Sequence, residues 1–198
     1  MNLPNKLTLS RFGLTVAFLV VMFTQIPFHQ TIALALFVAA GISDFLDGQI
    51  ARRRKLITNF GILMDPLADK IMVCSAFIAF VELGWFKAWM AVVIVARELA
   101  ITGLRLLAAS KNVVLAAEGY GKHKTVSQII AIIAIFISNI IAQNEWGSVG
   151  QAIFGWPISG HSWAWWVAAI FKWVAVVLTF ISGALYLWKN RALYLDDM

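Results

Sequence analysis

Charged residues are scarce in this sequence. Asp, Glu, Lys and Arg together make up 13% of its 198 residues, about half of the roughly 25% that is usual in soluble globular domains. None of the four occurs in residues 12–43, 125–144, 146–171 or 173–188. Because an apolar helix needs about 20 residues to cross a bilayer, these stretches exclude an ordinary water-soluble domain and predict several membrane crossings.

Cysteine is also nearly absent, since Cys74 is the only one. A lone cysteine excludes an intrachain disulfide and offers no spacing for a cysteine metal site. The chain is instead rich in apolar and aromatic residues: 61% are hydrophobic, nine are Trp and 14 are Phe. We therefore predict an all-α integral membrane protein, organised as a single domain over residues 1–198.

Six membrane-spanning helices are predicted from the apolar stretches and the turn-like sequences between them. They cover approximately residues 8–26, 31–53, 65–83, 88–109, 123–143 and 163–188. The connection 144–162 is rich in Gly, Ser and Trp. We expect it to be irregular, with room for an interfacial helix.

The positive charges gather at the ends that an even number of crossings places on one side of the membrane. Lys87 is nearly alone at the opposite ends, where tryptophans are common instead. By the positive-inside rule both termini of this multi-pass protein are predicted to be cytoplasmic. The formal net charge of +6 does not require a nucleic acid, because anionic lipids or an anionic substrate account for it.

Four aspartates occur where the second and third predicted spans meet. At 100° per residue, one arc of about 100° on the second span holds Asp44, Asp47, Gly48 and Ala51, with Arg52 at its edge. Asp65 and Asp69 are one turn apart on the next helix, with Pro66 expected in its first turn. Carboxylates packed together repel one another, so we expect divalent cations between them, Mg²⁺ or Mn²⁺. The alternative is a solvated network of ion pairs with neighbouring basic residues.

The same residues resemble a known family. The signature D-x-x-D-G-x-x-A-R-x(8)-G-x-x-x-D-x-x-x-D of the CDP-alcohol phosphotransferases is matched without a gap over residues 44–69. Three further stretches, "LPNKLTLSRF", "VARELAITGLR" and "GKHKT", resemble the phosphatidylglycerophosphate synthase branch. The resemblance covers about residues 3–135.

This resemblance implies a six-helix fold with its active site at the cytoplasmic end, commonly as a homodimer among membrane lipids. It implies transfer of the phosphatidyl group of CDP-diacylglycerol to sn-glycerol 3-phosphate, with release of CMP. Two metal ions would be held by Asp44, Asp47, Asp65 and Asp69, of which Asp69 would also be the general base. The CDP-linked donor would be bound by Gly48, Ala51, Arg52 and Gly61.

A basic cluster is predicted to bind the phosphate of the acceptor. It consists of Arg97 and Arg105 in the fourth span and Lys122 and Lys124 at the start of the fifth. A buried arginine is costly unless it meets an anion, and the alternative anion is the neighbouring Glu98. Two other functions stay open: a relative that uses inositol phosphate, serine or phosphatidylglycerol as acceptor, and a divalent-cation transporter.

Overall fold

The structure is a computed structural model. It describes residues 3–54, 59–111, 113 and 120–195, and the side chains of 9–43, 70–111, 113, 124–191, 193 and 194. In this part of the chain six helices have 21 to 27 residues. They are α1 (Leu3–Phe23), α2 (His29–Arg54), α3 (Asn59–Glu82), α4 (Ala88–Ser110), α5 (Tyr120–Ala142) and α7 (Trp163–Lys189).

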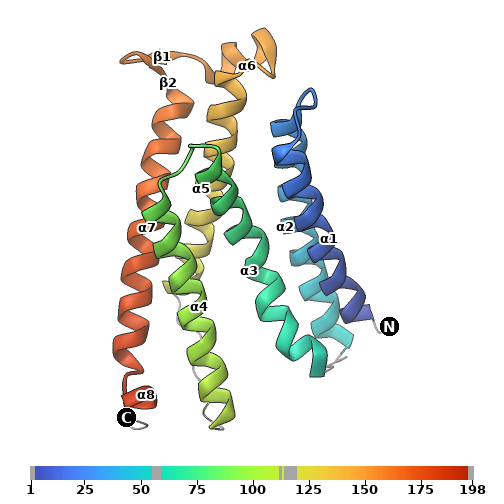
Figure 1. The fold of residues 1–198 in the computed structure, drawn as a ribbon, viewed down its shortest axis with the longest axis vertical. Coiled ribbons are helices and arrows are strands. Elements are labelled where there is room, and N and C mark those ends of the chain that lie inside the picture. The colour runs from blue at the N-terminus through green and yellow to red at the C-terminus, as the bar shows by residue number, and fades with distance from the viewer. Residues whose placement is uncertain (1–2, 55–58, 112, 114–119, 196–198) are drawn as a thin grey trace.

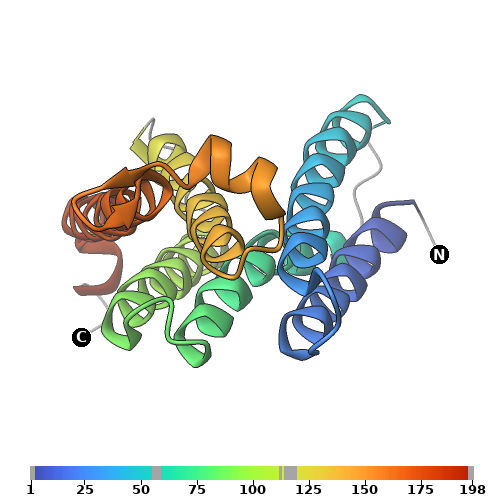
Figure 2. The same cartoon turned by 90° about the horizontal axis from the view of Figure 1, so that it is seen from above.

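The six long helices run alternately up and down the bundle (Figure 1). Seen from above, α3 lies between the pair α1 and α2 and the group α4, α5 and α7 (Figure 2). Both chain termini lie at one end of the bundle, here called the terminal end (Figure 1). The short helix α6 (Gly147–Phe154) and the strands β1 (Pro157–Ile158) and β2 (His161–Ser162) lie at the other, the hairpin end.

Aromatic side chains form the centre of the bundle. Phe136 of α5 contacts Phe18 of α1 and Phe80 of α3 edge to face, with ring centroids 6.2 and 5.1 Å apart. Phe77 stacks at a tilt on Phe86, at 4.9 Å. These buried rings join α1, α3 and α5, and such pairs contribute about 0.5–1.5 kcal/mol each beyond their buried area.

The outer surface of the bundle is also apolar. Every one of the six long helices exposes large hydrophobic side chains, among them Val16, Val38, Ile78, Val92, Val126 and Ile170. By length and composition two helical segments in the described part of the chain qualify as membrane spans, Lys124–Ala142 and Trp163–Lys189. Because large exposed apolar surfaces are unusual on soluble monomers, the surface fits a lipid environment.

A carboxylate from the α5–α6 connection caps the start of α2 at the hairpin end. Glu145 accepts hydrogen bonds from the backbone N–H groups of Gln30 (3.2 Å) and Thr31 (3.0 Å) and from the Thr31 hydroxyl (2.7 Å). The indole of Trp146 donates to the same hydroxyl at 2.9 Å. An anion is stabilised at a helix N-terminus because the first N–H groups have no partner inside the helix. These contacts fasten α2 to a segment more than 100 positions away along the chain.

The connection predicted to be irregular contains regular structure. Helix α6 occupies the position of the interfacial helix for which the prediction left room. A hairpin follows, in which Ile158 pairs with His161. Its two turn residues, Ser159 (φ 49°) and Gly160 (φ 85°), both have positive φ, as a tight two-residue hairpin turn requires.

Two helices begin several residues before their predicted starts. Helix α1 begins at Leu3 rather than near residue 8. The third long helix begins at Asn59 rather than near Asp65, so the prediction that Pro66 lies in its first turn was wrong. Pro66 instead lies inside α3, where it cannot donate the usual backbone hydrogen bond to the carbonyl four positions earlier. The helix nevertheless continues through the proline, and the apolar stretch on both sides of it forms one helix.

Candidate active site

The four aspartates of the motif lie on α2 and α3, near the terminal end of the bundle. Only four residues join the end of α2 to the start of α3, so these two helix ends are close to each other. At 1.5 Å per residue, Asp44 and Asp69 are each about 15 Å from these ends, and Asp47 and Asp65 about 10 Å. Asp44 and Asp69 therefore lie at a similar distance from these helix ends, and so do Asp47 and Asp65.

The aspartate side chains lie outside the described part of the structure. The same is true of Gly48, Ala51, Arg52, Gly61 and Lys122. The roles assigned to these residues from the sequence therefore stay predictions. What the structure adds for them is the helical backbone: α2 is continuous through Asp44 and Asp47, and α3 through Asp65 and Asp69.

A buried ionic cluster surrounds Glu98 on α4. The Glu98 carboxylate accepts from Lys124 of α5 through Oε1. Its Oε2 lies 3.5 Å from Arg97 Nη1 and 3.6 Å from Lys70 Nζ of α3. Lys70 also donates to the hydroxyl of Thr102, which itself donates to the Glu98 backbone carbonyl at 2.7 Å. One carboxylate thus binds cations from three helices.

The side chains of this cluster differ in the fraction of their surface that is exposed. The side chains of Glu98 and Lys124 are 5% exposed and that of Arg97 is 12% exposed, whereas Lys70 reaches 25%. Lys70 directly follows Asp69 in the sequence. The most accessible cation of the cluster therefore belongs to α3, the helix that carries Asp65 and Asp69.

Helix α7 accommodates the two arginines of α4. A Cβ atom at Gly183 would lie 2.6 Å from Arg97 Cγ, well inside van der Waals contact. Arg105 Nε donates to the hydroxyl of Tyr186 at 3.4 Å, and its guanidinium lies 5.7 Å from the centre of that ring. Glycine at position 183 is thus needed for the close approach of Arg97, and Tyr186 orients Arg105.

Some of the residues predicted to bind the acceptor meet at one carboxylate, and further polar residues contact them. Arg97 and Lys124 meet through Glu98, whereas Arg105 contacts Tyr186 on α7. No role in acceptor binding was predicted from the sequence for Lys70, Thr102 or Tyr186. Lys70 could have been noticed in the sequence because it is a charged residue within an apolar span. No feature of the sequence marked Thr102 or Tyr186.

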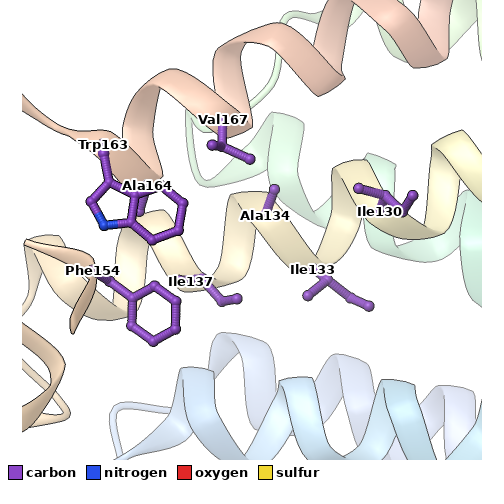
Figure 3. Close-up of a pocket in the computed structure, with 8 residues that line it drawn as sticks. All are labelled: Ile130, Ile133, Ala134, Ile137, Phe154, Trp163, Ala164 and Val167. Atoms are coloured by element: carbon purple, nitrogen blue, oxygen red, sulfur yellow. The ribbon is translucent and has the colours of Figure 1, made fainter.

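A separate pocket of about 210 Å³ lies between α5, α6 and α7 (Figure 3). Its lining is entirely apolar and consists of Ile130, Ile133, Ala134, Ile137, Phe154, Trp163, Ala164 and Val167. The lining has no charged side chain that could bind a phosphate or a metal ion. The pocket is therefore not a candidate for the catalytic centre.

Comparison with known proteins decides the family. A sequence model described as CDP-alcohol phosphatidyltransferase matches residues 1–181. The chain belongs to this family. The match extends beyond the aspartate motif to nearly the whole chain, α4, α5 and most of α7 included. It confirms the resemblance seen in the sequence.

Individual relatives of this CDP-alcohol phosphatidyltransferase are similar over most of their length. A CDP-diacylglycerol–glycerol-3-phosphate 3-phosphatidyltransferase of Bacillus subtilis is 37% identical over 96% of this chain and 95% of its own. A protein of the same name from Rickettsia bellii is 31% identical over 93% of both chains. A probable phosphatidylglycerophosphate synthase of Mycobacterium tuberculosis is 35% identical, over 93% of this chain and 79% of its own.

The donor set of the motif fits a divalent metal ion. CDP-alcohol phosphatidyltransferases generally use divalent metal ions, and four carboxylates from two adjacent helices offer the all-oxygen ligands that such hard ions prefer. Among the side chains that the structure describes, no other group of three or more His, Cys, Asp or Glu residues gathers. Spans apolar enough to cross a bilayer, in a membrane enzyme family, indicate that the chain associates with a membrane.

Proposed function

We propose that this chain transfers the phosphatidyl group of CDP-diacylglycerol to sn-glycerol 3-phosphate, forming phosphatidylglycerophosphate and CMP. One observation carries the proposal: relatives that share this activity in their names are similar along nearly the whole chain, the acceptor-side helices α4 and α5 included. The basic cluster on those helices suits a phosphorylated acceptor, whereas serine, which bears an ammonium group, would be repelled.

In the proposed reaction a hydroxyl oxygen of glycerol 3-phosphate attacks the phosphorus that bears the diacylglycerol. A new phosphorus–oxygen bond forms to glycerol, and the bond to the bridging oxygen of CMP breaks. Asp69 accepts the hydroxyl proton as general base. Gly48, Ala51 and Gly61 leave space for the cytidine and pyrophosphate beside the backbone, and Arg52 lies near the donor phosphates.

We assign two ions, Mg²⁺ or Mn²⁺, to the ligands Asp44, Asp47, Asp65 and Asp69. When bound there, such ions neutralise the pyrophosphate and stabilise the charge that develops on departing CMP. The acceptor phosphate is held by Arg97, Arg105, Lys122 and Lys124. Guanidinium groups suit this task because they donate in a fork that matches phosphate oxygens.

The proposed setting is a single-domain homodimer in the bacterial inner (cell) membrane, with six spans and both termini cytoplasmic. The alternating long helices, the common end of the two termini and the apolar outer surface support this arrangement. Reporter fusions test it: a fusion after Met198 should report the cytoplasm, and one near Gly150 the exterior. A C-terminus on the exterior would contradict the even number of spans.

The experiment that tests the activity is CMP release by the purified protein from CDP-diacylglycerol, with each acceptor supplied in turn. We expect turnover with sn-glycerol 3-phosphate and far less with serine or inositol phosphate. Arg105→Ala should raise the KM for glycerol 3-phosphate much more than the KM for CDP-diacylglycerol. Faster CMP release with serine or inositol phosphate would show that the acceptor is wrong although the family is right.

A further inference from the structure

Glu98 is the shared acceptor of a cluster that spans three helices. Lys70 comes from α3, Arg97 from α4 itself and Lys124 from α5, and all three contact the one carboxylate. A carboxylate this deeply buried is costly to desolvate and needs partners of opposite charge. A single cation would be sufficient for that purpose. The convergence of three indicates that the position of the cations matters in its own right.

Arg97 has donor capacity that the protein does not use. Its Nε atom is buried and has no hydrogen-bond partner within the described part of the structure, whereas its Nη1 is held at Glu98. Buried donors are nearly always satisfied in folded proteins, so an orphaned one calls for an explanation. An anionic ligand that accepts from the free edge of the guanidinium would supply it.

We propose that Glu98 is a positioning residue, which holds Lys70, Arg97 and Lys124 in one arrangement that binds the phosphate of the acceptor. Lys70 is thereby a phosphate-binding residue in addition to those assigned above. This inference rests on the proposed function. Lys70, the most exposed of the three cations, comes from α3, the helix that also carries Asp65 and Asp69.

Replacement of Glu98 by glutamine distinguishes a role of Glu98 in positioning the cations from a role in packing alone. The shape of the side chain is kept, but one carboxylate oxygen becomes an NH₂ donor. In either orientation of the amide, this donor faces at least one cation that previously donated to the carboxylate. Aspartate keeps both oxygens and the charge but is one methylene shorter, so we expect it to restore part of the function.

The experiment compares wild type, Glu98→Gln and Glu98→Asp in steady-state CMP release, with Glu82→Gln as the control because Glu82 is an exposed carboxylate at the end of α3. We expect Glu98→Gln to raise the KM for glycerol 3-phosphate at least tenfold while the KM for CDP-diacylglycerol stays within about twofold. Glu98→Asp should lie between wild type and Glu98→Gln. Equal rises of both KM values, or an unchanged KM for glycerol 3-phosphate, would overturn the positioning role.

Thr102→Val provides a second test, which leaves the charges intact. It can be used if Glu98→Gln does not fold. It removes the hydroxyl that accepts from Lys70 and should raise the KM for glycerol 3-phosphate several-fold. If Thr102→Val and Glu98→Asp both keep the wild-type KM, the proposal is refuted.

A binding measurement distinguishes failure of this inference from failure of the proposed function. Inorganic phosphate should raise the unfolding temperature of the wild type in detergent, and should do so less for Glu98→Gln and Thr102→Val. If glycerol 3-phosphate supports no CMP release, the proposed acceptor fails, but the phosphate-dependent shift still reports on the cluster. If wild type and variants shift equally, the positioning role fails while the proposed activity stands.

Discussion

The carboxylate of Glu145 at the start of α2 permits a quantitative prediction of stability. Its Oε1 accepts from the Gln30 N–H and its Oε2 from both donors of Thr31. In Glu145→Gln the amide oxygen can face Thr31 and keep those two bonds, but the NH₂ group then opposes the Gln30 N–H. One hydrogen bond to a charged acceptor is lost, which is worth about 1.5–3 kcal/mol, together with the favourable charge at the helix N-terminus.

We therefore expect Glu145→Gln to lower the free energy of unfolding by about 2–3 kcal/mol. For a chain of this size each kcal/mol shifts the unfolding temperature by about 2–4 °C, so the loss corresponds to roughly 4–12 °C. Thermal unfolding in detergent measures it, with Glu82→Gln as the matched control at an exposed carboxylate. At temperatures well below unfolding the turnover number should not change, because Glu145 lies at the hairpin end.

An unfolding temperature within 1 °C of the wild type would refute this reasoning. It would mean that the start of α2 is held by its apolar packing and that water replaces the carboxylate at no cost. A comparable decrease in Glu82→Gln would also refute it, because the effect would then follow from the loss of any negative charge.

The remaining predictions concern the site itself. Gly183→Ala would force Arg97 to move by about 1 Å, so the KM for glycerol 3-phosphate should rise about tenfold or more, whereas Gly103→Ala, whose added Cβ meets nothing within 4 Å, should not change it. Asp69→Asn should abolish CMP release yet keep binding of CDP-diacylglycerol, because a general base acts only in the chemical step. A chelator should abolish wild-type turnover, and activity should fall by orders of magnitude in Asp44→Asn, Asp47→Asn and Asp65→Asn.

The long helices and the aspartate motif could be predicted from the sequence. Length, apolar composition and the gaps between charged residues are local properties, and they placed the six long helices within a few residues of most of their observed ends. The exceptions were the start of α1 at Leu3, predicted near residue 8, and the start of α3 at Asn59, predicted near Asp65. A proline is usual in a first turn, so Pro66 was taken as a boundary, but a single missing hydrogen bond did not end the helix.

The motif could be found for the same reason. Asp44 and Asp47 are about one helical turn apart, as are Asp65 and Asp69, and one short connection joins their two helices. Which residues share a face, and which helix ends lie together, therefore follow from helical geometry alone.

Only the tertiary structure decided the contacts between helices. Nothing in the sequence pairs Glu98 with Lys124 or Lys70, Arg97 with Gly183, or Glu145 with the start of α2. Such contacts depend on the rotation and tilt of each helix against its neighbours, which are set by the packing of whole faces and leave no periodic signal in the chain. The composition determined that this chain folds as apolar helices and the motif determined which two helices carry its four aspartates, whereas packing determined which cations lie around Glu98.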